Sequence, residues 1–119
     1  CAPLKDGVRE TTGMAFRWHP RWGIVLVRGR SMAPTFAGWR RFPVVDYRRR
    51  PVVGDVVVAV RLDGLRLVKR VTGHDETGWW LESDAAEPGT VFSDSWVFGP
   101  LADDRILGVV VWPKPARLP

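Results

Sequence analysis

The feature that most constrains the fold is a hairpin pattern in the middle of the chain. The run Val56–Val60 is continuously apolar and mostly β-branched, which is typical of a buried strand. Asp63-Gly64, a dipeptide common in tight hairpin turns, follows it. Residues 65–71 then return with side chains that alternate along the run. This pattern predicts two paired antiparallel strands at the centre of the protein.

The rest of the chain repeats short apolar runs bounded by Gly and Pro. Further strands are expected at 22–28, 42–47, 79–82 and 106–112, with a short helical turn at 103–105 and a long loop from 83 to about 95. Many short strands separated by turns indicate an all-β fold, in which coiled antiparallel sheets form a sandwich or an open barrel. In a chain of 119 residues we expect an N-terminal arm over 1–17, one domain over 18–113 and a C-terminal tail over 114–119.

The charge balance permits an anionic partner. The net charge is +5, and seven tryptophans suggest a partly exposed apolar or membrane-adjacent surface. Most arginines are spread along the chain, however, and no RNA-binding or helix-turn-helix pattern accompanies them. We therefore expect no nucleic acid, and an anionic membrane surface stays a candidate partner.

Cysteine and histidine are scarce, which excludes several kinds of site. Cys1 is the single cysteine and His19 and His74 the only histidines, so we expect no internal disulfide and no zinc cluster. The sequence also shows no metal-ligand spacing, so no metal site is expected, and the mechanism predicted below needs no cofactor. A chain that starts on cysteine indicates trimming or processing. No apolar run approaches the ~20 residues of a membrane span. The protein is expected either at a membrane, through an anchor removed from this chain, or in the cytoplasm.

A serine in a bent loop is the first candidate for chemistry. Ser31 follows an apolar run and lies between Gly29 and Pro34, so a sharply bent backbone could expose its hydroxyl and aim N–H groups at the same point. The alternative is a simple turn in which Ser31 bonds its own backbone. A serine becomes a nucleophile only when a base removes its proton.

Lys69 is the candidate base. Strand alternation places it on one face with Leu65, Leu67 and Val71, whereas Arg66 and Arg70 face the other way. Burial disfavours the charged amine, so the pKa of Lys69 should fall. The alternative is a slipped register or a bulge that leaves Lys69 in water. A neutral lysine beside a serine can act as its general base, as in Ser–Lys dyads.

The chain also resembles signal peptidase I-type serine proteases. The resemblance rests on four boxes in order, spanning about 70 residues: Ser31-Met32-Ala33-Pro34-Thr35, residues 51–57, Lys69-Arg70-Val71, and Asp94-Ser95 with Phe98-Gly99. With 79–84 and the small size, the chain is most similar to compact members that mature nickel-type superoxide dismutase. The resemblance implies that Ser31 is the nucleophile, Lys69 the general base, and the Ser31 N–H, with the backbone at Gly29, the oxyanion hole. It places the substrate beside Met32 and Pro34.

One departure concerns the hydroxyl that orients the lysine. In many relatives a serine lies two residues before the Asp of Asp-Ser, and here that position is Phe92. We predict that Ser93 or Ser95, on either side of Asp94, supplies this hydrogen bond after a shift of the loop.

These features predict a serine endopeptidase that removes a signal or leader peptide from a protein substrate. Two alternatives stay open: a self-cleaving repressor-type peptidase domain with the same dyad, and a non-catalytic module that binds a peptide or a membrane. A histidine triad through His74 and Asp75 is disfavoured, because both residues lie in a hydrophilic turn.

Overall fold

The computed structural model describes residues 12–27, 41–84 and 95–115. Within them, seven strands form one antiparallel sheet with the order β1-β2-β3-β7-β4-β5-β6. The strands are β1 (Thr12–Arg17), β2 (Trp22–Val27), β3 (Val44–Asp46), β4 (Val56–Val60), β5 (Arg66–Asp75), β6 (Gly78–Glu82) and β7 (Ile106–Trp112). A single helical turn, α1 (Ser95–Phe98), follows β6, and the 3-10 turn η2 (Asp103–Arg105) precedes β7.

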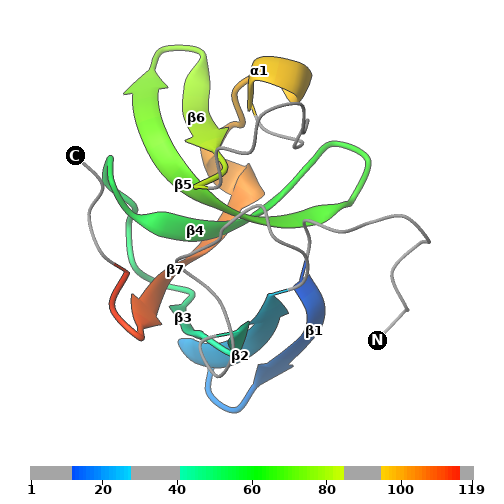
Figure 1. The fold of residues 1–119 in the computed structure, drawn as a ribbon, viewed down its shortest axis with the longest axis vertical. Coiled ribbons are helices and arrows are strands. Elements are labelled where there is room, and N and C mark those ends of the chain that lie inside the picture. The colour runs from blue at the N-terminus through cyan, green and yellow to red at the C-terminus, as the bar shows by residue number, and fades with distance from the viewer. Residues whose placement is uncertain (1–11, 28–40, 85–94, 116–119) are drawn as a thin grey trace.

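The sheet is strongly coiled, so that its two ends lie in different layers (Figure 1). β1, β2 and β3 form one end, β5 and β6 the other, and β4 and β7 cross between them (Figure 1). The coil brings Cα atoms of β1 within 8 Å of β5. This curvature joins two segments that lie at least 49 residues apart in the chain, Thr12–Arg17 and Arg66–Asp75.

Two apolar cores lie on the two faces of the sheet. The first core consists of Val25, Val27, Val45, Val56, Val58, Val68 and Val110. The second core consists of Val57, Ala59, Val71, Trp79, Leu81, Leu101 and Val109. β4 contributes alternate residues to both, which explains why its sequence is continuously apolar instead of alternating with polar residues.

The predicted all-β fold with an open sheet is confirmed, although the strands form a single sheet. The expected strands all occur, the hairpin turn at Asp63-Gly64 is present, and the helical turn at 103–105 is η2. An arm without strand structure was expected over 1–17, but its last part, Thr12–Arg17, is an edge strand that pairs with β2. Pairing with a neighbour stabilises this strand even though its own sequence has little alternation.

The edge of β6 is partly covered by the segment that follows it. The Trp79 N–H donates to the Leu101 carbonyl at 2.7 Å, and the Leu101 N–H donates back at 2.9 Å. The hydroxyl of Ser95, at the start of α1, accepts the Leu81 N–H at 2.8 Å. These bonds occupy backbone groups that an edge strand would otherwise expose.

Candidate active site at the β5–β6 ladder

Lys69 is completely buried on the apolar face of β5. Its exposed fraction is 0%, as are those of Leu67 beside it and Val57 directly opposite it on β4. Because opposite residues of antiparallel strands share a face, Lys69 lies on the side of the second core, to which Val57 and Val71 belong. The prediction that Lys69 faces an apolar surface is confirmed.

The Lys69 amine has a neutral hydroxyl partner. Its Nζ donates to the Ser83 Oγ at 2.7 Å. Ser83 is half-buried and follows directly after the last residue of β6. A buried amine requires hydrogen-bond acceptors, and a hydroxyl accepts without adding a negative charge. Lys69 therefore lies among apolar side chains of β4 and β5, and its amine donates a hydrogen bond to Ser83.

A β-bulge decides which residue of the β6 side meets Lys69. Near the turn, Asp75 pairs with Gly78 and Gly73 with Trp80, but farther along Val71 pairs with Leu81 and Arg70 with Glu82. Thr72 is the extra residue that produces this shift by one position. Without it, the register would continue to place Asp84 opposite Lys69. With it, Ser83 takes that place.

The opposite face of the same ladder carries an ion pair. Arg70 donates through Nε and Nη2 to the two carboxylate oxygens of Asp84, at 3.0 and 2.8 Å, and through Nη1 to the Gly54 carbonyl at 2.8 Å. The exposed fractions of the two side chains are 5% and 1%. Two parallel bonds to a carboxylate fix the geometry of the pair, so the backbone on either side of Ser83 is anchored.

The other predicted site residues fall in two groups. Ser95 is buried, and its hydroxyl bonds the backbone of Leu81, whereas the hydroxyl on Lys69 comes from Ser83, which the sequence analysis did not select. The remaining predicted residues lie outside the described residues: Gly29, Ser31, Met32, Pro34, Ser93 and Asp94. The Ser31–Lys69 dyad stays a prediction.

Ser83 could have been identified as the partner of Lys69 only if the pairing register of β5 and β6 had been known. It lies two residues after Leu81, so both side chains project to the same face of the hairpin. The position of the bulge determines whether that face is the one of Lys69. The sequence alone contains no marker that places the bulge at Thr72.

His74 takes no part in this site. Its ring is exposed and stacks on Trp79, with the ring centroids 3.7 Å apart and an angle of 8° between the planes. It lies near the tip of the hairpin, five residues from Lys69 along β5. This exposed position is the one expected from the sequence, which disfavours a catalytic triad through His74 and Asp75.

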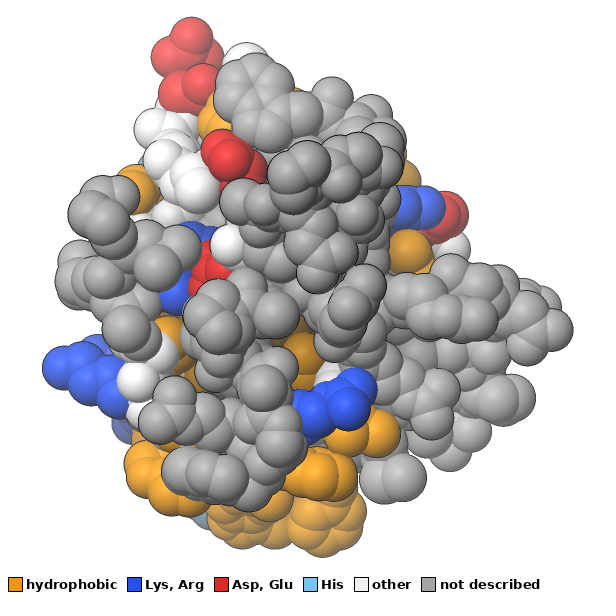
Figure 2. Space-filling view, in the orientation of Figure 1, with side chains coloured by type: hydrophobic (Ala, Val, Ile, Leu, Met, Phe, Trp, Pro, Cys, Tyr) orange, Lys and Arg blue, Asp and Glu red, His pale blue; other side chains and the backbone are white. Residues whose placement is uncertain are grey.

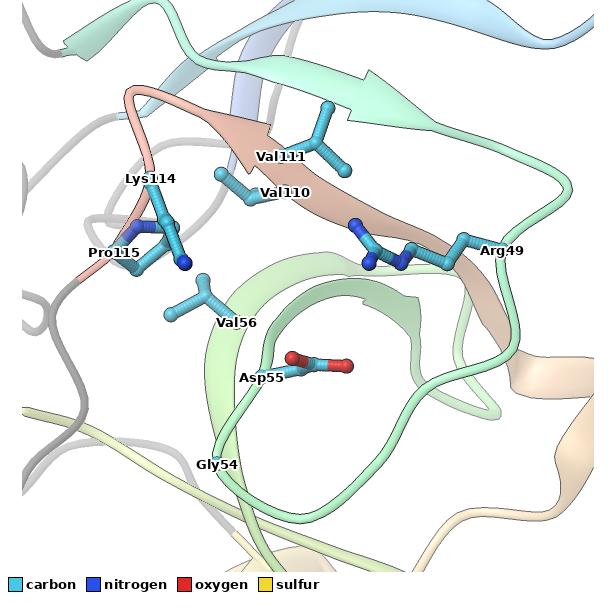
Figure 3. A pocket seen from close by; sticks show the side chains of 8 residues that line it. All are labelled: Arg49, Gly54, Asp55, Val56, Val110, Val111, Lys114 and Pro115. Carbon is cyan, nitrogen blue, oxygen red and sulfur yellow. The ribbon is translucent and has the colours of Figure 1, made fainter.

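A separate basic pocket of about 320 Å³ opens on the side of the first core. Its lining residues are Arg49, Gly54, Asp55, Val56, Val110, Val111, Lys114 and Pro115. The side chains of Arg49 and Lys114 reach toward it from opposite sides, and that of Asp55 lies between them in the view (Figure 3). The Asp55 carboxylate accepts the Val52 N–H at 2.9 Å. The pocket thus has two cationic groups and one carboxylate.

An exposed apolar patch marks the β1–β2 end of the molecule. Figure 2 shows hydrophobic side chains gathered there, with Lys and Arg side chains near them. Phe16 and Trp18 are exposed and stack on each other, with ring centroids 6.5 Å apart. The predicted exposed apolar surface is present at this end.

Comparison of the chain with protein-family models, curated proteins and solved structures found no match. Within the described ranges, no group of three or more His, Cys, Asp or Glu side chains is arranged to hold a metal ion. No helix in this part of the chain is long and apolar enough to cross a membrane. The fold and the Lys69 environment therefore carry the functional argument.

Proposed function

We propose that the protein is a serine endopeptidase that removes a leader or signal peptide from a protein substrate. The observation that carries the proposal is the burial of Lys69, whose amine donates to a neutral hydroxyl on an apolar face. Desolvation favours the uncharged amine, which is the form that acts as a general base.

The proposed reaction uses Ser31 and Lys69. The Ser31 Oγ bonds to the scissile carbonyl carbon while its proton passes to the Lys69 Nζ. The C–N bond breaks, and Lys69 gives the proton to the leaving amine. A water molecule then attacks the acyl-enzyme, Lys69 takes its proton, and the Ser31 oxygen leaves with that proton. Backbone N–H groups at the Ser31 loop would stabilise the oxyanion in both steps.

The outer edge of β1 is a suitable place for an extended substrate. No strand among the described residues pairs with this edge, whereas the Ser95 and Leu101 bonds partly cover the β6 edge. The coil of the sheet brings β1 close to β5, which carries Lys69. A peptide added to β1 as a further strand would gain main-chain hydrogen bonds.

The proposal is tested with a defined peptide library. The wild-type protein and the variants Ser31→Ala and Lys69→Ala are incubated with the library, and new peptide termini are identified by mass spectrometry. We expect cleavage after small residues by the wild type and none by either variant. Cleavage by Ser31→Ala at the wild-type rate would refute the mechanism.

A second candidate function is binding to an anionic membrane surface. The specific observation is the basic pocket, which Arg49 and Lys114 flank, together with the exposed Trp112 two residues before Lys114. Cationic side chains attract anionic headgroups, and tryptophan prefers the membrane interface. Sedimentation with vesicles that contain phosphatidylserine tests this function. Equal sedimentation with neutral vesicles, or of a double Arg49→Ala, Lys114→Ala variant, would contradict it.

A further inference from the structure

We infer that Ser83 is the positioning residue of the proposed general base. This inference rests on the proposed function, because it assigns Ser83 a role through Lys69. In that role the Ser83 oxygen holds one N–H of the Lys69 amine and so restricts the directions in which the lone pair of the amine can point.

The geometry of the hydrogen bond supports this role. A lysine side chain ends in a freely rotating amine on a flexible stem, so burial alone does not orient its lone pair. The Nζ–Oγ distance of 2.7 Å fixes the direction of one N–H bond. An amine whose N–H is held in this way loses much of its rotational freedom, which is the condition for efficient proton transfer.

The surroundings hold Ser83 itself in place. It is joined to β6, whose residues Leu81 and Glu82 pair with Val71 and Arg70 of β5. On its other side, Asp84 is held by the two bonds from the buried Arg70 guanidinium. A positioning side chain needs a rigid backbone on both sides, and the backbone is anchored both before and after Ser83.

The neutral character of Ser83 matters as much as its position. A carboxylate at this place would stabilise the charged ammonium and so remove the base. The bulge at Thr72 directs Asp84 to Arg70 on the other face and leaves a hydroxyl for Lys69. Ser83 thus orients the amine without favouring its protonation.

The test uses the activated ester p-nitrophenyl acetate as an acylating probe. In the proposed step the Ser31 Oγ forms the acyl bond, p-nitrophenolate leaves, and Lys69 takes the Ser31 proton. The rate of p-nitrophenolate release is measured against pH, and the acylated residue is identified by peptide mass mapping. Circular dichroism and thermal unfolding establish that each variant is folded.

We expect Ser83→Ala to slow acylation by about 10- to 100-fold, since misplacement of a reacting group has effects of this size. Ser83→Thr, which keeps the hydroxyl, should restore most of the rate. Ser83→Cys keeps the size of the side chain but offers a weak acceptor, and it should behave like Ser83→Ala. Thr77→Ala is the matched control, because it removes an exposed hydroxyl at the tip of the same hairpin.

The outcomes separate this inference from the proposed function. If Ser31→Ala abolishes acylation but Ser83→Ala, Ser83→Cys and the wild type share one rate and one pH profile, the role of Ser83 is wrong and the proposed function stands. If Ser31→Ala is acylated as fast as the wild type, the proposed function is wrong. An acyl group found on Ser83 of the wild type would make Ser83 the nucleophile and overturn the positioning role.

Discussion

The two faces of the β5–β6 ladder provide different partners for two neighbouring basic side chains, Lys69 and Arg70. On one face the Lys69 amine donates to the neutral hydroxyl of Ser83, and on the other the Arg70 guanidinium is paired with the Asp84 carboxylate. Both side chains are buried. A guanidinium keeps its charge under all ordinary conditions, so its burial requires a counter-charge, whereas an amine can lose its proton. One face therefore pairs a buried charge with a counter-charge, whereas on the other a buried amine donates to a neutral hydroxyl.

The largest effect is expected from Lys69→Met, which removes the proposed base but preserves the length of the side chain. Cleavage or acylation activity should fall by about 10⁴-fold, the upper range for loss of a general base. The free energy of unfolding should change by only about 1 kcal/mol, because an apolar side chain fits an apolar face and one hydroxyl loses its partner. Chemical denaturation and the p-nitrophenyl acetate assay measure the two effects. If Lys69→Met kept native activity, Lys69 would not be the base, and the proposed functional difference between the two faces would be wrong.

Asp84→Ala is the corresponding change on the structural face. It leaves the buried Arg70 guanidinium without its carboxylate, and the free energy of unfolding should fall by about 3–5 kcal/mol. The midpoint of urea unfolding measures this loss. Asp63→Ala serves as the control, because Asp63 is exposed and its ion pair with Arg61 should contribute little to stability. Equal losses in both variants would show that burial of the Arg70–Asp84 pair has no energetic consequence.

The pH dependence of acylation sharpens the comparison. Burial favours the neutral form of Lys69, so the rate should rise with pH and level off well below ~10.4, the usual pKa of a free lysine. The pH–rate profile of the p-nitrophenyl acetate reaction, corrected for hydrolysis in buffer, measures it. His74→Ala should leave the profile unchanged, since this ring stacks on Trp79 away from Lys69. A profile that still climbs in step with free lysine would mean that the amine is solvated.

The smallest effect is expected at the ion pair between Arg21 and Asp46, which lies in the β1–β3 half of the sheet. Hydrogen bonds from the Arg21 side chain hold the pKa of Asp46 below its ordinary value. The depressed pKa contributes stability that is present above the ordinary carboxyl pKa and is lost as the pH falls through the folded pKa. In Arg21→Ala the loss of stability on acidification should be shallower than in the wild type. Thermal unfolding between neutral and acid pH tests this, and parallel curves would contradict it.

Local patterns predicted most of the fold. The apolar run of β4, the Asp63-Gly64 turn and the alternation of β5 were sufficient to predict the central hairpin and the face of Lys69. Period-two alternation is a property of the backbone, so it can be read without knowledge of the partner strands. The strand Thr12–Arg17 was missed, because its place in the sheet depends on pairing with β2.

What the sequence determined by itself is that a lysine lies on an apolar strand face, with Arg70 on the opposite face. What only the tertiary structure decided is the partner of each. The extra residue Thr72 shifts the β5–β6 register by one position, so Ser83 meets Lys69 and Asp84 meets Arg70. A shift of one residue exchanges the two faces of a strand, and nothing in the local sequence reveals it. The chemistry of the lysine therefore depends on a pairing register that forms only when the two strands come together.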